Sequence, residues 1–376
     1  MEIIFFILIA VYALAILQLY FGFNKVKTFS FPSDLSPKTQ FTIIVPFRNE
    51  AKNLPKLLAS LSNLNYPKEY IEVIMIDDAS KDNSSSIFIQ WRMKNDKIDT
   101  TLLENLRLSN SPKKDAISRA IPIVKNPWIV TTDADCEVNP NWLSSIDSFI
   151  QNNSCEMIAA PVLYRTKNNW FHHFQQMELL SLQASTIGSF GIKKPFMCNG
   201  ANFAYTKKLF LALGGFEGNN SIASGDDVFL LQKAISKFPE KVSFLKDENA
   251  IVTTTPENDL YTLFMQRIRW ASKTSSYNSS YPKLLASVVF FANAIMVYGV
   301  MALIFGKIDW KIFFILFMIK YIADFLLLQK ANSFFKRNKI IIPLASAFVY
   351  PFFATIVGIF SVFGKYTWKK RKFKKA

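Results

Sequence analysis

Four groups of residues in this chain have side chains that could bind a charged ligand or move a proton. Three are pairs of acids: Asp77 with Asp78, Asp133 with Asp135, and Asp226 with Asp227. The fourth is the sequence Gln266-Arg-Ile-Arg269-Trp270. Carboxylates can ligate a divalent cation or take a proton from a hydroxyl, and arginine can bind phosphate oxygens through two parallel hydrogen bonds. This combination indicates an enzyme that holds a metal-bound diphosphate and activates a hydroxyl.

Short apolar runs with the composition of buried strands precede the first two acidic pairs. The runs occupy residues 41–46, 73–76 and 128–132. The second ends just before Asp77 and the third just before Asp133, while residues 53–64 show apolar residues at helical spacing. Buried strands that alternate with helices predict an α/β fold with a doubly wound sheet over residues of about 38 to 250. Ligands bind beyond the carboxyl ends of the strands in such sheets, where these acids fall.

Apolar segments at both ends of the chain are long enough to cross a membrane. Residues 1–23 carry only one charge, Glu2, and about 20 apolar residues span a bilayer core. A cleaved signal peptide is the competing interpretation, but a basic start and a small-residue cleavage site are both missing. Three more apolar segments follow, at residues 284–305, 312–328 and 340–363. We therefore expect transmembrane helices to flank the α/β domain.

Charged residues and prolines distinguish the later apolar segments. Lys320 and Asp324 lie four positions apart on one helical face, so we expect them to face protein or each other. Pro343 and Pro351 predict a kink in the last segment. Basic residues after the first segment and in the tail at 364–376 place the middle domain in the cytoplasm. If the three late segments all crossed the membrane, the basic tail would lie outside the cytoplasm, against the tendency of basic residues to stay inside. We therefore expect one late segment to be re-entrant or interfacial, the alternative being that this tendency fails here.

Composition excludes several classes of protein. The 376 residues carry a net charge of +16, are 50% hydrophobic and have a mean hydropathy of +0.16, which fits neither an ordinary soluble protein nor a simple transporter. The basic residues are scattered or close to membrane segments and form no nucleic-acid-binding motif, so the expected partner is the bilayer. No P-loop is present. The cysteines, at 136, 155 and 198, lack metal-ligand spacing and are expected to be reduced structural residues.

The motifs together resemble those of family 2 glycosyltransferases. They occur in the order Pro46-Phe-Arg48-Asn-Glu50, Asp77-Asp78-Ala-Ser, Asp133-Ala-Asp135, Gly225-Asp226-Asp227 and Gln266-x-x-Arg269-Trp270. The resemblance covers residues of about 40 to 275 and is to the membrane branch that contains ceramide glucosyltransferase and the cellulose, chitin and hyaluronan synthases. It implies a nucleotide-sugar-binding domain of the GT-A type and a metal-dependent inverting hexosyltransferase. The apolar segments, the basic residues and a composition with few Gly and many Lys, Asn, Phe and Ile favour a bacterial inner membrane, with the catalytic domain in the cytoplasm.

The apolar segments, the charged residues and the motifs together divide the chain into functional segments. We expect a transmembrane helix at 1–23, a linker at 24–37, the transferase domain at 38–255, an interfacial helix region at 256–283, membrane or re-entrant segments at 284–363 and a basic tail at 364–376. An amphipathic stretch at 169–187 is expected either to lie in the membrane interface or to pack in the core. The sequence assigns no oligomeric state.

Donor binding is implied for residues that follow the predicted strands. By resemblance, Asp78 holds the base or ribose of a nucleotide sugar, expected to be UDP-linked, and the same pocket is lined by Pro46, Arg48 and Glu50. Lys113 is expected to meet phosphate or base, although Pro112 stands where the family has glycine, and a solvated lysine is the alternative. Asp133 and Asp135 are expected to hold Mg²⁺ or Mn²⁺, the alternative being a turn with solvated acids.

The resemblance also implies the catalytic and acceptor residues. Asp227 is the expected base, with Asp226 beside it where the family usually has glutamate, and capping of the helix at 228–237 is the structural alternative. Gln266, Arg269 and Trp270 share a helical face, where Arg269 would retain the diphosphate and Trp270 would form a wall of the acceptor site. The alternative is an interfacial aromatic and basic helix end. In the loop after Cys198, Gly200 is expected to allow close approach of the backbone or to form a plain turn.

The acceptor is predicted from the small number of apolar segments. Few spans favour one transfer to a lipid, such as a ceramide-like or diacylglycerol-type lipid, over extrusion of a polymer. A processive polysaccharide synthase is the alternative, and a non-catalytic membrane scaffold that kept the fold is an alternative of another class. The size of the product would separate the first two.

Overall fold

The computed structural model describes residues 2–32, 36–219, 222, 224–336, 343–363, 366–368 and 371–373. These residues pack as two compact units. The sheet unit consists of Lys27–Arg165 and Met197–Thr255, and the helical unit consists of Met1–Val26, Thr166–Phe196 and Pro256–Lys375. The transferase domain predicted at 38–255 is thus interrupted by Thr166–Phe196, which packs with the apolar helices.

The sheet unit is built on a seven-stranded mixed sheet with the order β3-β2-β1-β4-β7-β5-β8. Its strands are β1 (Phe41–Phe47), β2 (Ile71–Asp77), β3 (Asp99–Glu104), β4 (Trp128–Thr131), β5 (Met157–Ala159), β7 (Phe203–Thr206) and β8 (Val242–Phe244). All neighbours pair in parallel except β7, which is antiparallel to β4 and β5. The predicted α/β fold is confirmed, with one antiparallel strand added to the predicted parallel set.

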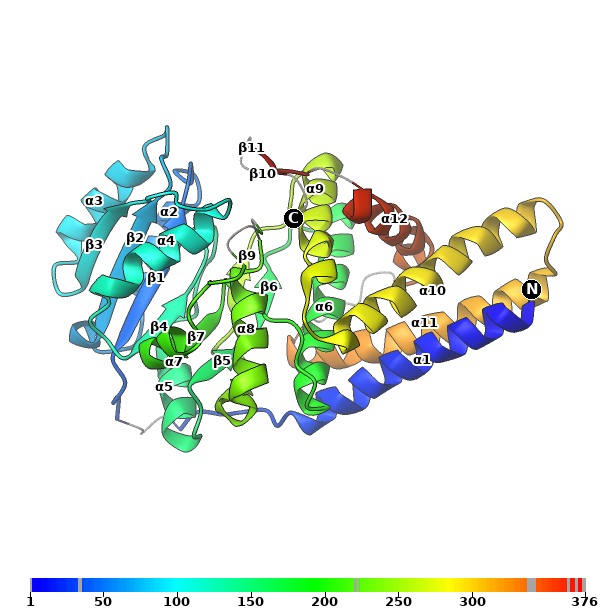
Figure 1. Cartoon of the computed structure of the whole chain (residues 1–376), viewed down its shortest axis with the longest axis horizontal. Helices are drawn as coiled ribbons and strands as arrows, with labels where there is room; N and C mark the ends of the chain where they lie inside the picture. Colours follow the sequence, from blue (N-terminus) through cyan, green and yellow to red (C-terminus); the bar gives the residue numbers. More distant parts are fainter. Residues whose placement is uncertain are drawn as a thin grey trace. The chain divides into compact units, whose positions relative to one another are not determined.

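Helices cover this sheet in the usual alternation. They are α2 (Leu54–Ser62), α3 (Ser84–Lys94), α4 (Pro112–Ala120), α5 (Trp142–Asn152), α7 (Lys207–Ala212) and α8 (Asp226–Lys237), with short turns at Lys68–Tyr70, Ile121–Ile123 and Pro239–Lys241. A small parallel pair, β6 (Val162–Tyr164) and β9 (Val252–Thr254), stands beside the main sheet. Figure 1 shows α2, α3 and α4 around the β1–β3 end. Apolar residues of α2 at helical spacing are buried, including Leu54, Leu57 and Leu61.

Strand order brings distant parts of the sequence to one edge. Strands β2, β1 and β4 are adjacent and parallel, with Phe47 opposite Asp77 and Ile44 opposite Thr131. Their carboxyl ends therefore meet at the same edge of the sheet. The chain leaves β1 for β2 on one side and later returns to β4 on the other, and this switch in order is where α/β sheets open a crevice.

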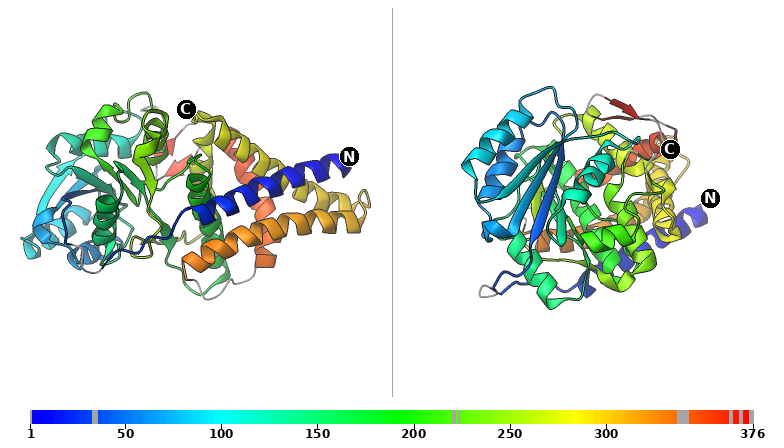
Figure 2. Two further views of the ribbon diagram at one scale, coloured as in Figure 1. Left: turned by 90° about the horizontal axis from the view of Figure 1, so that it is seen from below. Right: turned by 60° about the vertical axis from the view of Figure 1, so that its left-hand side comes forward.

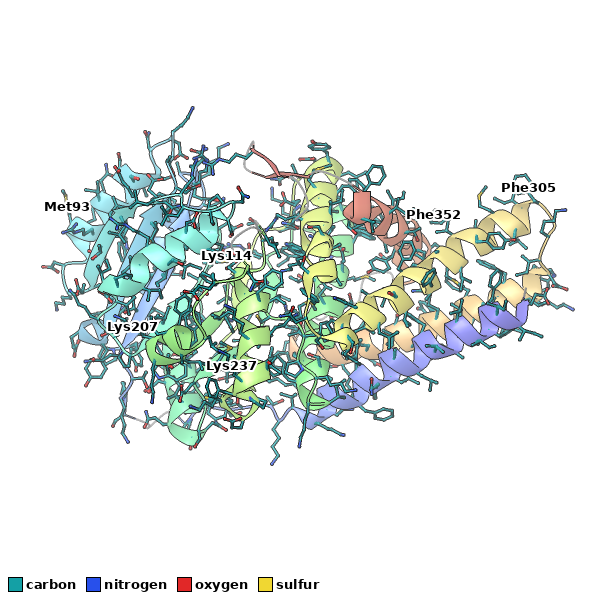
Figure 3. All side chains as sticks on the ribbon, in the orientation of Figure 1. Met93, Lys114, Lys207, Lys237, Phe305 and Phe352 are labelled. Carbon is teal, nitrogen blue, oxygen red and sulfur yellow. The ribbon has the colours of Figure 1, made fainter. Side chains whose placement is uncertain are left out.

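The helical unit contains the long apolar segments. Its helices are α1 (Glu2–Lys25), α6 (Trp170–Gly191), α9 (Leu260–Ser272), α10 (Ser280–Ile304), α11 (Trp310–Phe334) and α12 (Pro343–Phe363), with a short turn at Thr274–Ser276. Among the described residues, α1, α10, α11 and the Ala345–Val362 part of α12 are long and apolar enough to cross a membrane, judged by length and composition alone. Helices α1 and α11 run side by side (Figures 1 and 2). Phe305 marks the turn between α10 and α11 (Figure 3).

The ends of two helices, Pro351 and the tail are further features of this unit, and the kink predicted at Pro351 stays a prediction. The amphipathic stretches form α6, capped by Asn169, and α9, capped by Asp259, each through a side-chain oxygen that accepts a backbone N–H. Pro351 lies inside α12. The described tail residues form an antiparallel strand pair, β10 (Tyr366–Trp368) with β11 (Arg371–Phe373). A re-entrant or interfacial late segment stays a prediction.

Lys320 and Asp324 face each other, as predicted. The Lys320 ammonium lies 2.7 Å from Asp324 Oδ2, and the hydroxyl of Tyr12 on α1 donates to Asp324 Oδ1. A lone charge in an apolar helix is costly, whereas a paired charge with a hydroxyl donor is much less so. The pair therefore also joins α11 to α1.

Glycines allow α1 and α6 to cross in direct backbone contact. A Cβ atom added to Gly188 of α6 would lie 2.3 Å from the Leu19 carbonyl oxygen, and one added to Gly22 of α1 would lie 2.2 Å from the Gly188 carbonyl oxygen. Small residues at such crossings let apolar helices pack closely where burial from water supplies little attraction.

We predict that Gly188→Ala destabilises the helical unit. The added methyl group meets backbone rather than a movable side chain, so overpacking of about 1–3 kcal/mol is expected. Gly299→Ala is the matched control, because its methyl group would meet only the ring of Phe313, which can shift. Thermal unfolding in detergent should show a lower midpoint for the first variant and a smaller change for the second. Equal midpoints would contradict a tight α1–α6 crossing.

Candidate active site

Asp78 follows β2 and is held firmly by its neighbours. Its N–H donates to the Phe47 carbonyl at 2.9 Å, and its largely buried Oδ1 accepts bonds from Asn105 Nδ2 at 2.9 Å and Arg107 Nε at 2.6 Å. Arg107 Nη2 also donates to the Asp78 carbonyl at 3.0 Å. The residue predicted to hold the base or ribose of a nucleotide is thus a fixed carboxylate with two donors beside it.

The residues after β1 fix the loops around Asp78. Arg48 donates to the carbonyl oxygens of Asp78 and Ala79, and Ala79 has a left-handed backbone with φ 56°. Glu50 is buried, and its carboxylate accepts a bond from Asn53 at 2.8 Å near the start of α2. Pro46 is half-buried within β1. In the structure, Arg48 and Glu50 therefore have clear supporting roles at this edge, and their predicted contact with the donor stays a prediction.

Lys113 joins two of the predicted acids. Its Nζ lies 2.7 Å from Asp133 Oδ1 and 3.3 Å from Asp226 Oδ2. Pro112, which stands where the resemblance expects glycine, is the first residue of α4, a position where proline is favoured. Burial works to lower the pKa of Lys113, but the charges of Asp133 and Asp226 outweigh it and raise the pKa above its ordinary value. The side chain is therefore an ammonium held between carboxylates.

The turn after β4 carries Asp133 and Asp135. The Asp133 side chain is 38% exposed, and Asp135 is half-buried with Cys136 Sγ at 3.7 Å from its Oδ1. Burial, together with the charges of Asp135 and Asp133, raises the pKa of the Cys136 thiol, so this sulfur stays protonated and is a poor metal ligand.

The site offers carboxylate oxygens for a cation. Over the described ranges, no group of three or more histidine, cysteine or acidic side chains could hold a metal. Two carboxylates that leave positions open for ligand oxygens suit Mg²⁺ or Mn²⁺, which prefer oxygen ligands. The ammonium of Lys113 lies between Asp133 and Asp226, which shows that these carboxylates accept a cation, although the lysine also offsets part of their negative charge.

Asp226 and Asp227 are the first two residues of α8. The helix begins at Asp226, and the capping position is occupied by Gly225, which has a left-handed backbone with φ 82°. The acids are therefore in the first turn, two residues before the predicted helix start, and they lie at the positive end of the helix dipole. Asp227 Oδ2 accepts a bond from the Gly200 N–H at 2.9 Å, and its Oδ1 accepts one from the Val228 N–H at 2.7 Å.

Gly200 lies at the centre of this arrangement. A Cβ atom added there would lie 3.0 Å from Asp226 Oδ2, 3.2 Å from Lys113 Nζ and 3.4 Å from Asp227 Cβ. The Gly200 carbonyl accepts a bond from the Thr131 hydroxyl at 2.8 Å, which ties the loop to β4. The missing side chain thus lets the backbone approach all three charged residues, as expected from the sequence.

The predicted Gln266, Arg269 and Trp270 lie half-buried on α9 in the helical unit. Within that unit, Gln266 Nε2 donates to Glu257 Oε1 at 2.7 Å. The ring of Trp270 is covered by the guanidinium of Arg267, at 4.3 Å from the ring centroid. The predicted roles of these three residues in binding diphosphate and acceptor stay predictions.

Sequence reasoning missed Arg267 and its partner Glu178. The two form an ion pair at 2.8 Å between α9 and α6, with side-chain exposures of only 4% and 8%. Asn105 and Arg107 were also missed, because strand β3 that precedes them was not recognised. Its residues Asp-Thr-Thr-Leu-Leu-Glu lie at the sheet edge and are only partly buried, so they lack the apolar run of the other strands.

The three cysteines are buried and form no disulfide among the described residues. His172 is buried and accepts a bond from the Lys167 N–H at 3.0 Å through Nδ1. These contacts fit packing roles.

Comparison with known proteins finds similarity over part of the chain. Residues 42–214 match the family described as Glycosyl transferase family 2, a match that includes Lys113, Asp133 and Gly200 and ends before Asp226. The glycosyltransferase AglE of Haloferax volcanii is 24% identical over 127 residues, which are 34% of this chain and 40% of the relative. The beta-monoglucosyldiacylglycerol synthase of Trichormus variabilis is 25% identical over 156 residues, 40% of this chain and 33% of the relative. The chain thus spans less than half the length of these relatives.

A solved structure shares the fold over nearly the whole chain. The mannosyltransferase PcManGT of Pyrobaculum calidifontis, determined in complex with GDP-Man and Mn²⁺, has a TM-score of 0.57 and 18% identity. The match covers 96% of this chain and 98% of that one. The predicted GT-A-type fold is therefore confirmed.

We predict that Glu178→Gln destabilises the helical unit by about 3–5 kcal/mol, because it removes the carboxylate that pairs with the buried Arg267 guanidinium at 2.8 Å. Glu137→Gln is the control, since the ion pair of Glu137 with Arg165 is more than one-third exposed on both sides and should contribute about 0–1 kcal/mol. Thermal unfolding in detergent would compare the two variants. An equal fall in the unfolding temperature of the two variants would contradict a larger stabilising contribution from the Glu178–Arg267 pair.

Proposed function

We propose that this chain is a membrane-bound inverting glycosyltransferase that moves a sugar from a nucleotide sugar to the hydroxyl group of a lipid. The observation that carries the proposal is the meeting of Lys113, Asp133, Asp226 and Asp227 around Gly200, in a chain whose residues 42–214 match family 2 glycosyltransferases. Cations and carboxylates in one place suit both tasks of the reaction, which are holding a diphosphate and removing a proton.

The donor binds along the carboxyl ends of β1, β2 and β4 in this proposal. Asp78, fixed by Asn105 and Arg107, binds the base or ribose, and Lys113 meets the diphosphate. Asp133 and Asp135 would hold Mg²⁺ or Mn²⁺, and the bound cation would offset the negative charge of the leaving nucleotide. UDP is the proposed nucleotide. The solved structure of PcManGT contains GDP-Man and Mn²⁺, which supports a nucleotide-sugar donor with a divalent metal and does not distinguish UDP from GDP.

Asp227 acts as the general base. Its carboxylate takes the proton of the acceptor hydroxyl while that oxygen attacks the anomeric carbon, and the bond from this carbon to the diphosphate breaks on the opposite face. The configuration at the anomeric carbon is therefore inverted, and no covalent sugar-enzyme intermediate forms. The bond from the Gly200 N–H fixes one carboxylate oxygen, which supports a defined orientation for proton transfer. In the same proposal Arg269 retains the diphosphate, while Gln266 and Trp270 border the acceptor.

The proposed acceptor is a lipid in the inner leaflet of a bacterial inner membrane, with the catalytic domain in the cytoplasm. Among the described residues, four helices are apolar enough to span a membrane. One relative is named as a beta-monoglucosyldiacylglycerol synthase, a name that denotes a diacylglycerol carrying one glucosyl group. Both observations support a single transfer to a lipid hydroxyl over synthesis of a polymer.

We predict that Asp227→Asn lowers sugar transfer by about a hundredfold or more, because the amide cannot accept the proton of the acceptor. The measurement is nucleotide release by purified protein in mixed lipid micelles with Mn²⁺, over a panel of UDP-sugars, with and without membrane lipid. Asp96→Asn, a change of the same type at an exposed position of the sheet unit, should leave the rate unchanged.

The product in that assay decides between the acceptor classes. One sugar on a lipid that enters organic solvent is expected, whereas a long polymer would identify a polysaccharide synthase. Lipid-dependent release that persists in Asp227→Asn would refute the role of Asp227. No release from any donor would contradict transfer from UDP-sugars.

A further inference from the structure

The ammonium of Lys113 occupies a place between two carboxylates from different elements. It belongs to α4, while Asp133 follows β4 and Asp226 begins α8. The Nζ distances are 2.7 Å to Asp133 and 3.3 Å to Asp226, and the Lys113 side chain is only 20% exposed. One side chain thus bridges the candidate metal ligand and the start of the helix that carries the proposed base.

Surrounding contacts favour this position of Lys113. Gly200 leaves the space that a side chain would take, with its Cβ position only 3.2 Å from Lys113 Nζ. The next residue, Lys114, is turned elsewhere, because its Nζ donates to the carbonyls of Asn219 at 2.7 Å and Ile222 at 2.9 Å. Of these two consecutive lysines, Lys113 is the one that forms the ion pairs with Asp133 and Asp226 (Lys114 is labelled in Figure 3).

We propose that Lys113 is an internal cation that competes with the divalent metal for Asp133, so that the free protein binds metal weakly and the metal loads together with the nucleoside diphosphate. The inference rests on the proposed function, since that function supplies the metal and the diphosphate. It adds a positioning residue that makes binding of the two ligands cooperative.

Charge explains the competition. A cation that binds Asp133 approaches the ammonium paired with the same carboxylate, and like charges at this distance repel each other. The negative oxygens of a diphosphate can accept hydrogen bonds from the Lys113 ammonium. Asp133 is then free to bind the metal, and the negative charge of the diphosphate offsets the positive charge of the ion. Because the Asp133 side chain is 38% exposed, solvent weakens the ion pair, so the expected competition is modest.

The test is titration of the whole protein in detergent with Mn²⁺ alone, without nucleotide, followed by the paramagnetic resonance signal of the free ion. Lys113→Gln is expected to bind Mn²⁺ about three- to tenfold more tightly than the wild type, in keeping with a partly exposed ion pair. Lys113→Arg keeps the charge and should retain the weak binding. The matched control is Lys237→Gln, an equal change of charge at the exposed C-terminal end of α8 (Figure 3).

The outcomes separate this inference from the proposed function. Tighter Mn²⁺ binding by Lys113→Gln alone supports competition, and UDP should then strengthen Mn²⁺ binding more in the wild type than in that variant. Equal or weaker binding by Lys113→Gln, or the same gain in Lys237→Gln, would overturn the inference. The titration requires no sugar transfer, so failure of transfer in the nucleotide-release assay would count against the proposed function and not against competition for Asp133. Thermal unfolding of the variants excludes misfolding as the cause.

Discussion

The contact of Lys113 with Asp133 and Asp226 is the interaction on which the candidate active site depends. It connects α4, the turn after β4 and the start of α8, which lie far apart in the sequence. Three carboxylates in so small a space would repel one another without a cation, and the absent side chain at Gly200 is what lets the lysine reach them. The arrangement therefore depends on both charge balance and space.

Both units of the chain contain charged side chains that are partly or fully removed from water. In the sheet unit, parallel strands bring acids to one edge, where Asp78 pairs with an arginine, Asp133 and Asp226 pair with a lysine, and Asp227 accepts backbone N–H bonds. In the helical unit, the charges that enter apolar helices are paired, as in Glu178 with Arg267 and Lys320 with Asp324. Glycines again supply the space, here where α1 crosses α6. Buried charges are tolerated in both units because they contact an oppositely charged side chain or a hydrogen-bond donor.

Local sequence patterns predicted the elements and much of the candidate site. The apolar runs before Asp77 and Asp133 form strands that are buried on both faces. The long apolar segments form helices whose length and composition suit a bilayer core. The antiparallel β7 and the half-buried edge strand β3 were missed, since neither has a pattern distinct from a loop. Arg107 and Arg267 were missed because their roles come from tertiary partners, Asp78 and Glu178, that no local spacing reveals.

The most direct test of this account is the sugar-transfer rate of Gly200→Ala. The new methyl group would press on the ends of the Asp226 and Lys113 side chains and would lie in ordinary contact with Asp227 Cβ at 3.4 Å, so folding should be retained while the first two groups are displaced. Small displacements of reacting groups are costly, and we expect transfer to fall at least about tenfold with an unchanged unfolding temperature. A variant that transfers sugar at the wild-type rate would contradict the claim that Gly200, Lys113 and the two aspartates form the catalytic centre.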